Sequence, residues 1–169
     1  RQDVDLQTER DPPVDDARRI ADRNVAEEPA IAAEDPERWF THHWGIDDRA
    51  AVKATLSWID SLSSDERFAG VVIPIAAHYP YSLPPDVPHA TVDARYERFL
   101  SAVRYVDLVF EELMKGLEAR GLADETLVIF VADHGAPFGS SRHATRGARL
   151  AYENNLLVPA LLLSPKLFP

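Results

Sequence analysis

The 169-residue sequence contains no cysteine. Disulfide frameworks and zinc sites built from thiolates are therefore excluded. Basic residues are also scarce, since 18 Lys and Arg stand against 28 Asp and Glu for a formal net charge of −10. A surface that binds nucleic acid or an anionic membrane needs clustered Lys and Arg, so this charge argues against both kinds of partner.

Long apolar runs are absent as well. No stretch approaches the roughly 18 to 20 apolar residues that a helix needs to cross a bilayer, and the N-terminus lacks the hydrophobic region of a signal peptide. The sequence opens with RQDVDLQTERDPPVDD, without an initiator Met, and stops at LLLSPKLFP, directly after a strand-like run. We therefore expect the chain to be a piece of a longer protein.

What is present suggests one folded unit preceded by an acidic segment. Apolar residues make up 46% of the sequence, which is ordinary for a globular protein, and the length is enough to bury a core. Residues 1–43 are acidic, contain proline and are weakly periodic, so we expect a weakly ordered or wrapping segment there. Residues 44–169 carry clear periodic patterns.

Those patterns predict alternating helices and strands. Apolar residues at three- and four-residue steps predict a helix that begins at Asp47 or Asp48 and a longer helix over residues 91–120 that ends at Gly121. Apolar runs predict buried strands within residues 68–81, 125–133 and 155–164, although Pro74 is awkward in a central strand because it removes one ladder donor. Strand, long helix and strand in succession predict an α/β fold with a mostly parallel sheet flanked by helices.

Polar residues follow two of the predicted strands. His78 ends the first, in HYPY, and Asp133-His134-Gly135 ends the second. Ligands of parallel α/β sheets bind beyond the carboxyl ends of the strands, and a carboxylate beside an imidazole there can bind manganese or zinc. The tripeptide alone fits a turn capped by Asp133 at least as well. His143 favours the metal hypothesis only modestly.

Other polar and aromatic residues are expected to be structural. Asp107 lies on the apolar stripe of the long helix, where a buried hydrogen bond is favoured over catalysis because an unpaired charge there would be costly. His42 and His43 are adjacent and are not expected to converge on one ligand, and His89 is expected to be exposed. The three tryptophans are expected to pack rather than to form a binding platform: Trp39, Trp44 and Trp58.

The order of these features resembles the C-terminal half of the sulfatase and alkaline-phosphatase superfamily. The resemblance rests on RYERFLSAVRYVDLVFEELMKGLEARGLADETLVIFVADHG followed by YENNLLVPALLLSP. Within the superfamily, WGIDD, AHYPY and TVDARY are most similar to the lipoteichoic acid synthase and phosphoglycerol transferase branch. The resemblance covers roughly residues 44–165 and implies an alkaline-phosphatase-like α/β/α sandwich, incomplete in this chain, with residues 44–169 as the C-terminal part of a catalytic domain.

By position, the resemblance implies that Asp133 and His134 ligate the catalytic divalent metal. The ion would be Mn²⁺ or Zn²⁺, or Ca²⁺ in a true sulfatase. His78 and His143 are implied to line the substrate site, and Arg142 and Arg146 either contact an anionic substrate or are ordinary solvated charges. The substrate would be a phosphate or sulfate ester, including a lipid headgroup.

The family's nucleophile and its other acidic metal ligand lie on earlier strands, so we expect this chain alone to be inactive. The resemblance further implies a parent that is tethered by preceding transmembrane helices at the extracytoplasmic face of the membrane. The alternatives are an arylsulfatase or phosphodiesterase of the same superfamily, and a non-catalytic binding domain that kept the fold.

Overall fold

The computed structural model describes residues 39–42, 44–88, 95–136, 138, 153–166 and 168. Most of the acidic segment 1–43 therefore lies outside the described residues. Among the predicted functional residues, five lie outside them as well: His43, His89, Arg142, His143 and Arg146.

The described part begins with a small hairpin that leads into the first described helix. Strands β1 (Thr41–His42) and β2 (Gly45–Ile46) pair antiparallel. Helix α2 (Asp48–Asp60) follows, and the Asp47 side chain caps it by accepting the backbone N–H of Arg49 at 3.0 Å. This confirms the predicted start, because a carboxylate at this position satisfies a helix donor that has no partner within the helix.

The long helix α3 spans Arg95–Ala119. It ends as predicted at Gly121, whose positive φ of 68° is a conformation that glycine adopts without strain. The N–H of Leu122 then bonds to the carbonyl of Leu117 at 2.9 Å, which closes the helix end with a six-to-one hydrogen bond. The short 3-10 helix η1 (Ala123–Glu125) follows.

The predicted strand at residues 68–81 is wrong, because the chain from 61 to 88 forms turns and extended segments without sheet pairing. Pro74 lacks a backbone donor, and the next two donors do not enter a ladder. The N–H groups of Ile75 and Ala76 bond instead to the carboxylate of Asp48, at 2.9 and 3.1 Å. A side chain from α2 thus takes the hydrogen bonds that a neighbouring strand would have used.

The other two predicted strands are present. Strand β3 spans Val128–Val131 and β4 spans Ala160–Leu163, and the short helix α4 (Glu153–Leu156) precedes β4. The α/β class is confirmed, but β3 and β4 pair antiparallel, with Val128 opposite Leu163. Both pairings among the described residues are antiparallel, so the predicted parallel arrangement is not found in this part of the chain.

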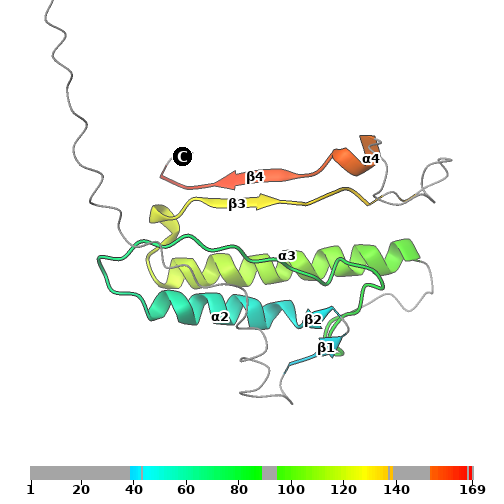
Figure 1. Cartoon of the computed structure of the whole chain (residues 1–169), viewed down its shortest axis with the longest axis horizontal. Helices are drawn as coiled ribbons and strands as arrows, with labels where there is room; N and C mark the ends of the chain where they lie inside the picture. Colours follow the sequence, from blue (N-terminus) through cyan, green and yellow to red (C-terminus); the bar gives the residue numbers. More distant parts are fainter. Residues whose placement is uncertain are drawn as a thin grey trace, which may run out of the picture.

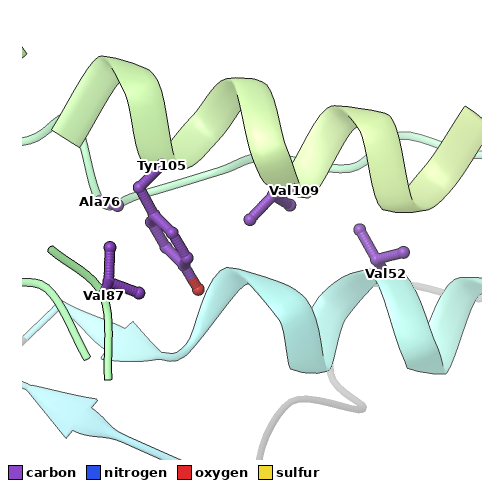
Figure 2. Packing of buried hydrophobic residues seen from close by; sticks show 5 residues of the cluster. All are labelled: Val52, Ala76, Val87, Tyr105 and Val109. Atoms are coloured by element: carbon purple, nitrogen blue, oxygen red, sulfur yellow. The ribbon is translucent and has the colours of Figure 1, made fainter. Parts of the chain in front are cut away.

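Helix α3 lies between α2 on one side and the β3–β4 pair on the other (Figure 1). Five buried residues from α2, α3 and the 61–88 segment form the first core cluster, shown in Figure 2: Val52, Ala76, Val87, Tyr105 and Val109. A second cluster joins Trp58 and Ile59 of α2 to Leu117 of α3, with Val128 of β3 packed against it. The core is therefore centred on α3.

Strand β3 is covered on one face only by the described residues. Val128 and Phe130 are half-buried, and the Phe130 ring lies 5.2 Å from that of Phe110 on α3. Ile129 and Val131 point to the other face and are each 60% exposed. The run is apolar on both faces, as predicted for a strand buried on both sides, but the described residues pack against only one side.

Candidate metal and substrate site

Asp133 and His134 lie where the sequence predicts, two and three residues after the last residue of β3. The Nε2 atom of His134 is 3.6 Å from Oδ2 of Asp133, and the two side chains are 51% and 88% exposed. Oδ1 of Asp133 accepts the backbone N–H of His134 at 2.8 Å. One carboxylate oxygen thus holds the turn, while the other lies beside the imidazole.

The imidazole of His134 has a defined proton arrangement. Its Nδ1 lies 3.0 Å from the carbonyl oxygen of Gly135. A carbonyl oxygen only accepts hydrogen bonds, so Nδ1 carries the proton, and Nε2 of the neutral ring presents a lone pair. Metal-binding histidines commonly donate their second ring N–H to a backbone carbonyl in this way.

The two atoms fit one divalent cation. With metal–ligand distances of about 2.1 Å, a separation of 3.6 Å corresponds to a ligand–metal–ligand angle of roughly 120°, within the range of tetrahedral and five-coordinate sites. Among the described residues there is no group of three or more His, Cys, Asp or Glu that could hold a metal ion. The pair can therefore supply two ligands, and a complete site needs others from outside the described part of the chain.

His78 lies on the turn between residues 75 and 81 and is exposed. Its Nδ1 is 2.8 Å from the carbonyl oxygen of Tyr79, so this ring also carries its proton on Nδ1. Its ring centroid is 4.0 Å from that of Trp44, with 50° between the planes. Nε2 of His78 is therefore the atom that can meet a ligand, as a donor when the ring is charged.

A group of aromatic rings joins the two candidate segments. Phe138, four residues after His134, packs against Phe99 at 4.6 Å and Tyr96 at 5.2 Å, both near the start of α3. It also lies 6.4 Å from Tyr81, which belongs to the turn that carries His78. The structure thus brings the turn after β3 and the His78 turn to the same end of α3.

Comparison with known proteins identifies the family of this chain. A family model described as Sulfatase matches residues 9–169. The chain belongs to the sulfatase family. The match spans nearly the whole chain, including most of the acidic segment. No curated protein matches this chain significantly.

One solved structure shows the fold. It is a protein in the alkaline phosphatase superfamily from Vibrio parahaemolyticus, with a TM-score of 0.58 and 24% sequence identity over 74% of this chain. The chain spans 29% of the length of that protein. The two comparisons together confirm the superfamily and an incomplete α/β fold.

The prediction for Asp107 can be compared with the structure. Asp107 is exposed, and no hydrogen bond from the described residues holds it, so the expected buried hydrogen bond is wrong. The buried stripe of α3 runs through Ala102, Tyr105 and Val109, and Asp107 lies about 200° around the helix from Tyr105. The role of His143 stays a prediction, because it lies outside the described residues.

A polar cluster surrounds Asp47 and Asp48, for which the sequence predicts only a helix cap. Both are 3% exposed. Asp47 accepts the Tyr105 hydroxyl and two guanidinium nitrogens of Arg49, which also bonds to Asp86. Burial and the Asp47 carboxylate raise the pKa of Tyr105, while the two carboxylates raise that of Arg49. The sequence signal that could have indicated this cluster is the pair of adjacent acidic residues directly before an apolar helix.

A hollow of about 600 Å³ lies beside α2, away from the candidate residues. Its cationic side chains already have partners. Arg49 is paired with Asp47 and Asp86, Arg120 with Asp60, and Lys53 lies over the Trp39 ring. Because these charges are satisfied within the protein, the hollow offers no evident site for an anionic substrate.

Proposed function

We propose that this chain is the C-terminal part of a metal-dependent enzyme that transfers or hydrolyses phosphate or sulfate esters. The observation that carries the proposal is the Asp133–His134 pair at the end of β3, with Nε2 and Oδ2 3.6 Å apart, in a chain of the sulfatase family. Both side chains are exposed, and their contacts with described residues involve only each other and Gly135. Such a pair is arranged for a ligand rather than for stability.

Asp133 and His134 would hold the ion through one carboxylate oxygen and one imidazole nitrogen. This donor set favours Mn²⁺ or Zn²⁺; Ca²⁺, which prefers oxygen ligands, is the alternative for a true sulfatase. When bound, such an ion lowers the pKa of an attacking hydroxyl and neutralises charge on the ester's non-bridging oxygens.

His78 and His143 are proposed to contact the substrate. Because Nδ1 of His78 is engaged with the Tyr79 carbonyl, the charged ring would donate from Nε2 to an ester oxygen. The aromatic contact between Tyr81 and Phe138 supports this assignment, since it keeps the His78 turn and the turn after β3 at the same end of α3. Arg142 and Arg146 are further candidates for contacts with an anion.

The outer face of β3 supports the view that this chain is part of a larger domain. Ile129 and Val131 are exposed there, and Leu162 of β4, which lies opposite Ile129 on the same face, is 53% exposed. Contiguous apolar side chains on a sheet face are typical of a surface that another element covers. We propose that the preceding half of the same catalytic domain, which would also carry the nucleophile and the remaining metal ligand, covers it. The chain alone would then be inactive.

Within the superfamily we favour phosphoglycerol transfer of the lipoteichoic acid synthase type, on the basis of WGIDD, AHYPY and TVDARY. The substrate would be a lipid headgroup carrying a phosphate ester, and the parent would be tethered at the extracytoplasmic face of a membrane. The described residues contain no helix that is long and apolar enough to span a bilayer. An arylsulfatase, a phosphodiesterase and a non-catalytic binding domain are the alternatives.

The test uses the protein at its full natural length, with Mn²⁺ affinity measured by electron paramagnetic resonance and activity on bis(p-nitrophenyl) phosphate and p-nitrophenyl sulfate. Asp133→Ala combined with His134→Ala should weaken Mn²⁺ binding at least about tenfold, since losing even one hydrogen-bond partner of a metal ligand typically costs about that much, and should abolish turnover. The control Asp124→Ala removes an exposed carboxylate from η1 and should change neither. Unchanged metal binding in the double variant would contradict the assignment of Asp133 and His134 as metal ligands. Turnover of the sulfate ester without turnover of the phosphate ester would indicate a sulfatase.

A further inference from the structure

The turn that carries His78 has little regular structure of its own. Two backbone hydrogen bonds shape it, from His78 N–H to the Ile75 carbonyl at 2.9 Å and from Tyr81 N–H to the His78 carbonyl at 2.8 Å. The surrounding segment 61–88 contains no helix or strand. A turn of this kind on the surface needs other elements to fix its position.

Asp48 holds the turn on the N-terminal side of His78. Its two carboxylate oxygens accept the consecutive N–H groups of Ile75 and Ala76, at 2.9 and 3.1 Å. Asp48 is only 3% exposed and lies in the first turn of α2, so its position is fixed by the helix. Charge-assisted hydrogen bonds of a buried carboxylate are among the stronger ones in a protein.

Trp44 holds the turn on the C-terminal side of His78. Its Nε1–H donates to the carbonyl oxygen of Tyr79 at 2.9 Å, and the same oxygen accepts Nδ1–H of His78 at 2.8 Å. The Trp44 ring also packs against the imidazole, with ring centroids 4.0 Å apart. Trp44 therefore orients both the ring of His78 and the carbonyl that sets its tautomer.

Trp44 and Asp48 are the first and last residues of WGIDD, which contains β2 and the first residue of α2. The two side chains reach the backbone on either side of His78, at residues 75–76 and at residue 79. We propose that Trp44 and Asp48 are positioning residues that hold the imidazole of His78 in place for substrate. The proposal rests on the proposed function of His78, because orienting its imidazole affects activity only if that imidazole contacts the substrate. It assigns to WGIDD a role that helix capping does not explain, since Asp47 alone is the cap.

Activity tests the proposal in the protein at its full natural length, with bis(p-nitrophenyl) phosphate and Mn²⁺. Asp48→Asn keeps one acceptor oxygen where two are needed, and Trp44→Phe keeps a ring but removes the N–H. Each should lower kcat/KM about tenfold, the effect of losing one charge-assisted or orienting hydrogen bond. Trp39→Phe is the matched control, since Trp39 lies over Lys53 rather than over His78, and should leave kcat/KM unchanged.

The decisive measurement repeats both substitutions in a His78→Ala background. If Trp44 and Asp48 act through His78, they should change kcat/KM less than about twofold once its imidazole is absent. Full tenfold losses in that background would overturn the proposal and show a general structural effect instead.

Hydrogen exchange separates failure of the positioning proposal from failure of the proposed function. In Asp48→Asn, the peptide that contains residues 75–79 should exchange about tenfold faster, because two amides lose a carboxylate partner. Unchanged exchange would overturn the positioning proposal by itself. Faster exchange together with unaltered kcat/KM in His78→Ala would confirm that Asp48 holds the turn and contradict the role of His78 in the proposed function.

Discussion

Asp47–Asp48 and Asp133–His134 are both adjacent polar pairs at the end of a secondary-structure element, but their surroundings are opposite. The first pair is 3% exposed at each residue, and its oxygens accept hydrogen bonds from Arg49, Tyr105 and two backbone amides. The second pair is 51–88% exposed and has only local partners among the described residues. Buried polar groups that are satisfied by the protein hold the fold together, whereas exposed groups with lone pairs directed outward remain available to a ligand.

The comparison predicts opposite effects of removing a carboxylate. Asp47→Ala should destabilise the protein by about 3 kcal/mol, because the Tyr105 hydroxyl and the Arg49 guanidinium lose their buried partner. Asp133→Ala should leave the unfolding midpoint at the wild-type value. Urea denaturation of both variants measures the difference, and equal destabilisation would contradict the division into a structural and a ligand-binding pair.

The two faces of β3 provide the same comparison, between a packed and an exposed side chain, within one strand. Phe130→Ala removes a ring that packs on Phe110 and should cost about 2 kcal/mol, less than a fully buried Phe because the residue is half-exposed. The matched variant Ile129→Ala removes an apolar side chain that is 60% exposed and should cost far less in this chain. Thermal unfolding of this chain and of the full-length protein provides the measurement. A large cost of Ile129→Ala only at full length would support a covering element over the outer face.

The smallest expected effect concerns the pH dependence of the buried cluster. Burial and the Asp47 carboxylate raise the pKa of Tyr105 above its ordinary value of 10.0 in the folded state. The neutral hydroxyl is thus favoured by folding, so its contribution is complete below pH 10 and is lost as the pH rises above that value. Tyr105→Phe should cost about 1 kcal/mol near neutral pH and should reduce the alkaline loss of stability.

Urea denaturation of wild type and Tyr105→Phe between pH 8 and about pH 11 measures that difference. The two curves should approach each other as the pH rises. A constant difference across the range would show that the hydroxyl of Tyr105 does not titrate differently in the folded and unfolded states.

Several features of the fold follow from the sequence near them. The cap at Asp47, the glycine after α3 and the apolar spacing within both helices predict where the helices lie. The strand before Asp133 is equally local, because an apolar run ends in residues that favour a turn. These features depend on neighbours a few residues apart, so they can be predicted without the tertiary structure.

The candidate site was predictable in part. The position of Asp133 and His134 after a strand was visible, but the Nδ1 proton of His134 depends on how the Gly135 carbonyl is oriented. Nothing in the spacing of His78 indicates that Trp44 packs on its ring, since the two residues are 34 positions apart. The role of His143 remains a prediction.

The sequence by itself determined the helices α2 and α3, the strands β3 and β4, the sulfatase family resemblance and the acid–imidazole pair at the end of β3. Only the tertiary structure decided that residues 68–81 pair with no strand, that β3 and β4 are antiparallel and that Asp107 faces solvent while Asp48 is buried. The physical reason is range. Helix caps and apolar periods depend on residues that are close in sequence. Burial and strand pairing depend instead on contacts with distant segments, such as the hydrogen bonds from Ile75 and Ala76 to Asp48.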